Sequence, residues 1–258
     1  MFTSNKPIKD WSDRHVWIIG ASEGIGLALG QALKLQQARL SVSARNENRL
    51  KDEFSGKARI LPMDVSSTEN VAHVMDLLIQ EGTVPDTVFW LPAVYHPGGV
   101  LSLDPEATLK RLNINLVSAF NLFPRIVRYW TKHPLTNKQY HWSWFSSLAA
   151  YRGLPNASDY GASRSAISHL AQSSHLELKR YNIDVSLISP GFVNTRLTQK
   201  NEFKMPLLMS PERAAQLTIK GLKSGKFETH FPKRLSILFK FLNIIPIDLY
   251  LKIMRLLK

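Results

Sequence analysis

Short apolar runs alternate with stretches of helical periodicity from Val16 to Phe231, and this alternation constrains the fold more than any other feature. The seven runs are VWIIG, ARLSVSA, ARILPM, DTVFWL, YHWSWFSS, IDVSLIS and KFETHF. Buried parallel strands take the form of such nearly continuous apolar runs, and crossover helices fill the segments between them. The pattern therefore predicts an α/β fold in which a doubly wound parallel sheet of about seven strands lies between two layers of helices.

Length and composition favour one domain over residues 1–258, with its core at about 14–231. The chain has 258 residues, of which 44% are hydrophobic and 21% charged, enough apolar surface for a substantial core. Cysteine is absent, which excludes disulfides and thiolate chemistry. The eight histidines form no HxxxH-type pair with a carboxylate, so we predict no metal site. The first twenty residues hold no apolar segment of signal-peptide length, and we expect a cytoplasmic protein.

Several helix starts can be recognised from capping residues. Asp104 and Ser210 each precede a proline, which is favoured at the first helical position. Ser66 with Glu69 three residues later predicts a capping box at the start of another helix.

A glycine-rich segment follows the first apolar run and opens a helix. Glycines at this spacing permit a tight turn and let backbone N–H groups approach a pyrophosphate, which the positive end of the helix favours. An ordinary strand-to-helix turn is the alternative. The segment lies in the first strand–turn–helix unit, however, where a Rossmann-like dinucleotide fold needs it. The candidate phosphate-binding residues are Gly20, Ser22, Glu23, Gly24, Ile25 and Gly26.

The end of the second strand indicates the choice of cofactor. A carboxylate there would hydrogen-bond the ribose hydroxyls and repel a 2′-phosphate, but this chain has Ser43-Ala44-Arg45-Asn46. The planar guanidinium of Arg45 matches a phosphate, so we expect NADP(H) as cofactor, the alternative being a solvated surface arginine. After the third strand, Asp64 and Val65 could contact the adenine, although Asp64 could equally cap the helix near Ser66.

Ser147, Tyr160 and Arg164 form the candidate catalytic centre. Helix positions four apart lie on one face, so Tyr160 and Arg164 should border one pocket, which Ser147 could reach from a strand end. A tyrosine held by a cation and a serine can donate a proton to a carbonyl or accept one from an alcohol. The segments 95–101, 151–156 and 197–208 should surround this pocket. Their Tyr, Leu, Phe and Met side chains favour an apolar substrate, unless they only pack beneath loops.

Three separated motifs together resemble the short-chain dehydrogenase/reductase family over roughly residues 14–231: the GxxxGxG segment, the Ser147 and Tyr160 pair, and Pro190-Gly191. The resemblance implies an oxidoreductase in which Tyr160 is the general acid or base and Ser147 orients the carbonyl. Asn115, rather than Asn113, would support a proton-relay water. A homodimer or homotetramer through the helices that carry Asn115 and Tyr160 is also implied. The resemblance adds these cofactor-binding candidates: Ala93, Tyr160, Arg164, Pro190, Gly191, Val193 and Thr195.

The chain departs from the family pattern in two places. Trp90-Leu91-Pro92-Ala93 replaces an Asn-Asn-Ala-Gly turn, and Pro92 lacks a backbone donor, so other contacts must secure this loop. Arg164 stands where the family has a lysine that holds the nicotinamide ribose. Arginine keeps the charge but presents a longer, rigid fork of donors. The chain is therefore either a carbonyl reductase or a cofactor-binding protein with little or no turnover. We favour the enzyme because Tyr160, Ser147 and Asn115 are retained.

An apolar and basic tail, residues 234–258, follows the last apolar run of the sheet. Lys240, Pro246, Asp248 and Lys252 interrupt its apolar stretches, which disfavours a membrane-spanning helix. The stretches ILFKFLNII and LYLKIMRLL instead predict two short amphipathic helices. Such helices could lie on an anionic membrane, cover the substrate cleft, or pack on the core of the protein.

A net charge of +13 favours an anionic partner. The basic residues are spread along the chain, and no nucleic-acid reader motif is present, so we expect no nucleic-acid partner. Trp142 and Trp144 lie on one face of an expected strand, and we attribute them to core packing rather than to base stacking.

Overall fold

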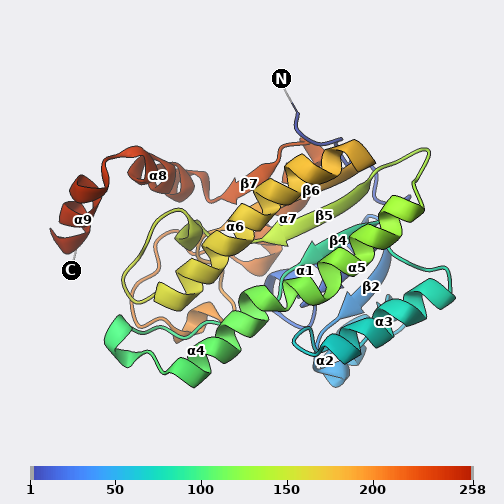
Figure 1. Ribbon diagram of the computed structural model, residues 1–258, viewed down its shortest axis with the longest axis horizontal. Helices are drawn as coiled ribbons and strands as arrows, with labels where there is room; N and C mark the ends of the chain where they lie inside the picture. Colours follow the sequence, from blue (N-terminus) through green and yellow to red (C-terminus); the bar gives the residue numbers. More distant parts are fainter. Residues whose placement is uncertain (1–2, 257–258) are drawn as a thin grey trace.

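A computed structural model describes residues 3–256 of the chain and contains one seven-stranded parallel sheet in the order β3-β2-β1-β4-β5-β6-β7 (Figure 1). Every predicted apolar run contains a strand, so the predicted fold class is confirmed. The edge strand β3 is short because only Arg59 and Ile60 pair with β2. The strands are β1 His15–Ile19, β2 Arg39–Ser43, β3 Arg59–Ile60, β4 Thr87–Trp90, β5 Tyr140–Phe145, β6 Ile183–Pro190 and β7 Glu228–Phe231.

Helices cover both faces of the sheet, because successive strand residues point to opposite sides. In β1, Trp17 and Ile19 join the core beneath α3, α5 and α6, whereas Val16 and Ile18 join the core beneath α1, α2 and α7. The described helices are α1 Gly24–Leu35, α2 Glu47–Phe54, α3 Thr68–Gln80, α4 Pro105–Leu112, α5 Ala119–Lys132, α6 Ser158–Leu178, α7 Pro211–Lys223, α8 Lys233–Ile244 and α9 Ile247–Leu256.

The two tryptophans of β5 belong to the first of these cores. Trp142 and Trp144 are fully buried, and their ring centroids lie 4.9 Å apart. Phe123 of α5 packs edge-on against both rings. These aromatic contacts confirm core packing as the role of the pair.

Capping residues define where the helices begin. The predicted caps Asp104 and Ser210 accept backbone N–H groups at the starts of α4 and α7. The cap predicted at Ser66 was wrong by one residue, since Ser67 caps α3. The Asp64 carboxylate instead accepts both the backbone N–H and the hydroxyl of Ser66, at 2.9 and 2.6 Å. This Asx turn moves the start of the helix along the chain.

The tail forms two helices, α8 and α9, as predicted. They extend from β7 at one end of the molecule, beyond the layers that cover the sheet (Figure 1). Over residues 3–256, no helix is both long enough and apolar enough to cross a bilayer.

Candidate active site

A cleft of about 1060 Å³ lies where the strands β1, β4, β5 and β6 end. This edge includes the switch point between β1 and β4, where the strand order reverses and where open α/β sheets bind ligands. All of the residues predicted to bind a dinucleotide contribute to its walls, together with Ser147. The structure thus brings together segments that are far apart in the sequence. The role of each residue in binding a dinucleotide stays a prediction.

The glycine-rich segment forms the floor of one end of the cleft. A side chain at Gly26 would place its Cβ 2.1 Å from the carbonyl oxygen of Gly20, and Gly24 has φ +58°, so both positions need glycine. Helix α1 begins at Gly24, and the Glu23 side chain makes no capping hydrogen bond to it. The first N–H groups of α1 therefore remain without a side-chain cap, which fits the pyrophosphate of a dinucleotide.

Three arginines, Arg45, Arg49 and Arg196, line the cleft near the glycine-rich segment and the end of β2. Arg45 lines its exposed rim. Arg49 and Arg196 also line it, and both pair with Glu23, with N–O distances of 2.7 and 3.5 Å. Sequence reasoning missed Arg49 and Arg196, although the four-residue spacing from Arg45 to Arg49 was a usable signal. The pairs offset the negative charge that Glu23 brings to an anion site.

Asp64 and Val65 line the cleft beyond the third strand. Asp64 does not cap α3, because Ser67 does, and the Asp64 carboxylate instead accepts from Ser66 in a turn. Contact of Asp64 with an adenine stays a prediction. The carbonyl of Val65 accepts a 2.9 Å hydrogen bond from Asn121, which ties this wall to α5.

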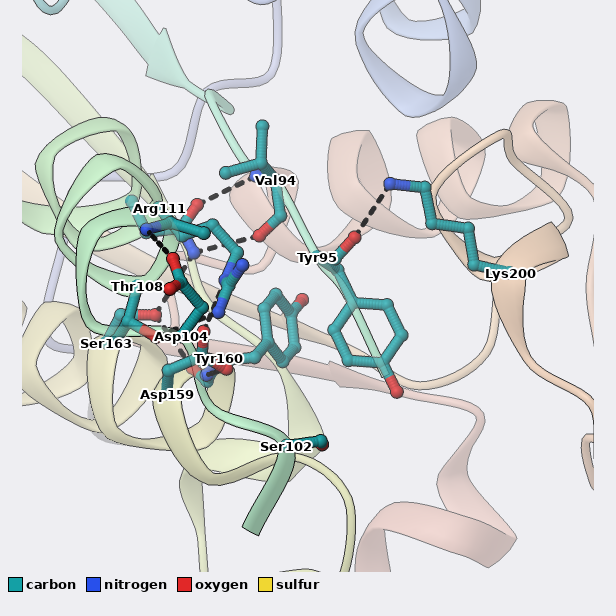
Figure 2. Close-up of polar contacts among 12 residues, drawn as sticks. Val94, Tyr95, Ser102, Asp104, Thr108, Arg111, Asp159, Tyr160, Ser163 and Lys200 are labelled. Carbon is teal, nitrogen blue, oxygen red and sulfur yellow. Dashed lines mark hydrogen bonds and ion pairs between the residues drawn. The ribbon is translucent and has the colours of Figure 1, made fainter. Parts of the chain in front are cut away.

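Ser147 and Tyr160 lie in the other end of the cleft. Ser147 begins a short 3₁₀ turn, and its Oγ accepts a 3.1 Å hydrogen bond from the N–H of Ala149, which leaves the hydroxyl proton available for donation. Tyr160 is half-buried in the first turn of α6, with its ring edge-to-face against Tyr95 at 5.0 Å (Figure 2). Within residues 3–256 no protein group hydrogen-bonds the Tyr160 hydroxyl.

A buried ion pair fixes the start of α6. Arg111 of α4 donates to Asp159 at 2.5 Å, and Asp159 also accepts the backbone N–H of Tyr160 at 2.8 Å (Figure 2). Because Asp159 is only 8% exposed, this pair is well shielded from water. Arg111 and Asp159 are positioning residues that sequence reasoning missed, since α4 and α6 meet only in the folded chain.

Arg164 lies behind Tyr160 with only 1% of its surface exposed. Its Nη2 donates to the Asn115 carbonyl at 2.7 Å, and its Nη1 donates to the Phe145 carbonyl at 3.3 Å. The guanidinium carbon is 5.5 Å from the centroid of the Tyr160 ring. Burial lowers the pKa of Arg164, while the nearby Tyr160 raises it. No carboxylate of the described residues pairs with this cation, and its Nε has no partner there.

Asn115 lies under the cleft rather than in its wall. It belongs to a π-helical turn, Asn113–Val117, between α4 and α5. Its side-chain amide accepts from the N–H of Val94 at 2.7 Å and donates to the carbonyl of Val94 at 2.9 Å. These two bonds hold the loop that contains Pro92 and Ala93, and thereby supply a replacement for the contacts that an Asn-Asn-Ala-Gly turn would make.

Metal ligation is not indicated by the side chains of residues 3–256. Nowhere in that span do three or more His, Cys, Asp or Glu side chains form a cluster able to hold an ion.

Comparison with known proteins places this site in a family. A family model described as short chain dehydrogenase matches residues 14–205. An uncharacterized oxidoreductase of Myxococcus xanthus is 26% identical over 93% of this chain and 96% of its own. A 3-dehydrosphinganine reductase of Arabidopsis thaliana is 28% identical over 86% of this chain and 71% of its own.

Solved structures share the fold. A short chain dehydrogenase from Burkholderia cenocepacia in complex with NADP superposes with a TM-score of 0.81 at 17% identity, covering 94% of this chain and 98% of its own. A short-chain dehydrogenase from Sphingobium yanoikuyae in complex with NADPH gives 0.79 at 18% identity, covering 89% and 92%. The family match extends over most of the chain and includes the glycine-rich segment, Ser147, Tyr160 and Pro190-Gly191, so this protein belongs to the short-chain dehydrogenase/reductase family.

Proposed function

We propose that the protein is an NADP(H)-dependent oxidoreductase that reduces a carbonyl group or oxidises the matching alcohol. The observation that carries this proposal is the single cleft that holds Ser147, Tyr160 and Arg164 together with the glycine-rich segment. When bound, NADPH supplies the hydride. Solved relatives of the same fold in complex with NADP and NADPH support this cofactor.

Proton transfer is assigned to Tyr160. Its hydroxyl donates its proton to the carbonyl oxygen as the carbonyl carbon gains the hydride, while the Ser147 hydroxyl hydrogen-bonds the same oxygen. The product is an alcohol, and Tyr160 is left as a phenolate. The buried charge of Arg164, 5.5 Å from the ring, stabilises that phenolate until a proton from water restores it. Oxidation of an alcohol follows the same steps in reverse.

The arginine-rich rim favours NADPH over NADH. Arg45 and Arg49 line the adenosine end of the cleft, and guanidinium groups match a 2′-phosphate in shape and charge. No acidic residue follows β2 at this point, since the chain reads Ala44-Arg45-Asn46.

A cofactor-binding protein without useful turnover is the second candidate, and one observation favours it. Arg164 directs Nη1 and Nη2 to backbone carbonyls, and its Nε is buried. Fewer of its donors are then left for a nicotinamide ribose than a lysine in this place would offer.

The substrate we propose is apolar. Large apolar side chains are exposed on two of the three segments expected to surround the pocket, namely Val100 and Leu101 on one and Phe203, Leu207 and Leu208 on the other. Two relatives, a 3-oxoacyl-[acyl-carrier-protein] reductase of Mycobacterium tuberculosis and the 3-dehydrosphinganine reductase, are consistent with this proposal. We also propose a homodimer or homotetramer through α6 and through α5 with the π-helical turn before it, where Val117, Phe120 and Leu176 are exposed.

Substitutions at Tyr160 and Arg164 test the enzyme, with NADPH oxidation measured against ketones and aldehydes of increasing chain length. Tyr160→Phe should lower turnover by at least about a hundredfold, because general acid catalysis contributes roughly 10²–10⁴. Arg164→Met should cause a similar loss, whereas Arg164→Lys, which keeps a cation, should stay within about tenfold of the parent. Tyr181→Phe is the matched control, since Tyr181 is exposed after α6 and far from the cleft.

Binding of NADPH and NADH, measured by calorimetry, separates the candidate functions. Tight NADPH binding with no oxidation in either the parent protein or Arg164→Lys would support the binding-only candidate. Near-normal turnover by Tyr160→Phe would exclude the proposed proton donor. An affinity for NADH that equals or exceeds that for NADPH would contradict the role of the arginine-rich rim.

A further inference from the structure

The tail helices carry an apolar face that no described part of the chain covers. On α8, Ile237, Phe241 and Ile244 are 59%, 61% and 82% exposed, and their spacing of four and then three residues places them on one side of the helix. On α9, Ile247 and Leu251 are 51% and 44% exposed and also lie four residues apart. We call these five residues the tail patch. Isolated exposed apolar side chains are ordinary, but a continuous stripe of them indicates a binding surface.

Other residues of the tail attach it firmly to the protein. Arg152, in the loop before α6, donates to the carbonyls of Leu242 and Ile245 at the end of α8. Tyr250 of α9 is only 2% exposed, and its hydroxyl donates to the carbonyl of Gly153 at 2.6 Å. Packing on the protein itself thus accounts for the inner side of the tail. It leaves the tail patch without a function.

A partly buried polar cluster adds a third attachment. Lys240 of α8 pairs with Glu228 of β7 at 2.6 Å, and the Glu228 carboxylate also accepts from Tyr151 and Ser189. Burial acts to raise the pKa of Glu228, but the bonds from Lys240, Tyr151 and Ser189 outweigh it and hold that pKa below its usual range. Helix α8 is therefore held in a fixed orientation, with its apolar side facing outward.

Charged residues beside the tail patch indicate which partner fits it. Lys233 and Arg234 are exposed at the start of α8, and Lys252 and Arg255 are exposed on α9, whereas Asp248 is the one acidic residue in the two helices. Cations that border an apolar stripe complement an anionic bilayer, where the apolar side chains enter the interface and the cations meet phosphate groups. Two copies of the same patch would instead bring cations against cations.

We propose that α8 and α9 dock the protein on the surface of an anionic lipid bilayer, with the tail patch in the interfacial layer. Neither helix lines the 1060 Å³ cleft. Helix α9 borders a second, smaller pocket of about 420 Å³ beside Val100 and Leu154, to which Leu251 contributes. The docking depends only on the exposed faces of the tail and is independent of the proposed oxidoreductase activity.

Flotation with lipid vesicles tests the docking on the full chain. We expect the protein to float with vesicles of phosphatidylcholine and phosphatidylserine, and to bind at least about tenfold more weakly to phosphatidylcholine alone or in high salt. Phe241→Asp should abolish most of the binding, and Arg234→Gln should weaken it about fivefold. Leu35→Asp is the matched control, because Leu35 is an 87% exposed apolar residue at the end of α1, outside the tail.

Thermal unfolding and sedimentation are recorded for each variant, so that misfolding and self-association are recognised. If Phe241→Asp proves unstable, Arg234→Gln and the comparison of the two vesicle types still decide the question. The proposal is overturned if the parent protein does not float with the anionic vesicles. It is also overturned if Phe241→Asp floats as well as Leu35→Asp. If the parent protein does not float but self-associates in sedimentation experiments, and Phe241→Asp abolishes that self-association, then the tail patch binds a second copy of the chain.

Discussion

Replacing Asn115 with alanine should destabilise the protein markedly, because one side chain holds the loop after β4 from below. Asn115 is 1% exposed, and its amide forms one accepting and one donating bond with the backbone of Val94, at 2.7 and 2.9 Å. Alanine would leave both of these backbone groups without partners. Each group that is left unsatisfied costs about 1–3 kcal/mol. Since Val94 is only partly buried, we expect a loss of about 2–4 kcal/mol in the free energy of unfolding.

Substituting Asn115 with aspartate distinguishes the contributions of the two hydrogen bonds. The carboxylate introduced by Asn115→Asp keeps the shape of the side chain and still accepts from the N–H of Val94. It would also place a charge opposite the Val94 carbonyl oxygen, which Asn115 contacts at 2.9 Å. We expect Asn115→Asp to be at least as destabilising as Asn115→Ala at neutral pH. It should recover relative to Asn115→Ala as the pH falls, because a protonated carboxyl can donate to the carbonyl.

Urea unfolding followed by tryptophan fluorescence measures these differences, since all six tryptophans are buried and will report global unfolding. Asn113→Ala is the matched control, because Asn113 lies in the same π-helical turn and its side chain has no hydrogen-bond partner among the described residues. The reasoning fails if Asn115→Ala costs less than about 0.5 kcal/mol, or no more than Asn113→Ala.

Two further predictions concern pH and assembly. His141 is buried, its Nε2 lies 2.9 Å from the Ser186 hydroxyl, and burial lowers the pKa of His141 from 6.5 to about 4. The unfolded chain therefore takes up a proton below pH 6.5 that the folded chain refuses until about pH 4. Stability that is present above pH 6.5 should fall by about 2 kcal/mol by about pH 5. His141→Gln should reduce that decline in urea titrations, and equal slopes would contradict the assignment. Phe120→Asp, at a 52% exposed position of α5, should convert the assembled protein to a monomer in sedimentation experiments, and a parent protein already monomeric would disprove the proposed interface.

The strands were predictable because a parallel strand that is buried on both faces is apolar at nearly every position. Each of the seven short runs retains enough of this apolar pattern to be recognised. Trp142 and Trp144 show the same effect, since a two-residue period alone identified their shared face. The π-helical turn at Asn113–Val117 was not predictable, because no glycine or proline marks it. It depends on contacts of Asn115 with Val94 and Arg164, which are distant in the sequence.

Many site residues were predictable because they follow the ends of parallel strands, and those ends lie together at one edge of the sheet. The four-residue spacing of Tyr160 and Arg164 correctly placed them side by side, as the 5.5 Å contact shows. The orientation of the Arg164 fork could not be inferred, because a long side chain can reach several acceptors. The carbonyls of Phe145 and Asn115 decide it, and both lie on other elements of the fold.

In the proposed mechanism Arg164 takes the place of the lysine that the family resemblance implies, and its contacts indicate how. A buried cation is costly unless hydrogen bonds or an opposite charge offset the loss of water, and the two carbonyls provide only dipoles. Since no carboxylate of the described residues competes for it, Arg164 is free to respond to a negative charge that develops on Tyr160. In the proposed mechanism, the direct 2.7 Å bond from Arg164 to the Asn115 carbonyl replaces the relay water that the family resemblance implies. Turnover should therefore depend on the charge at position 164 more than on the shape of its side chain, so that Arg164→Met affects it far more than Arg164→Lys.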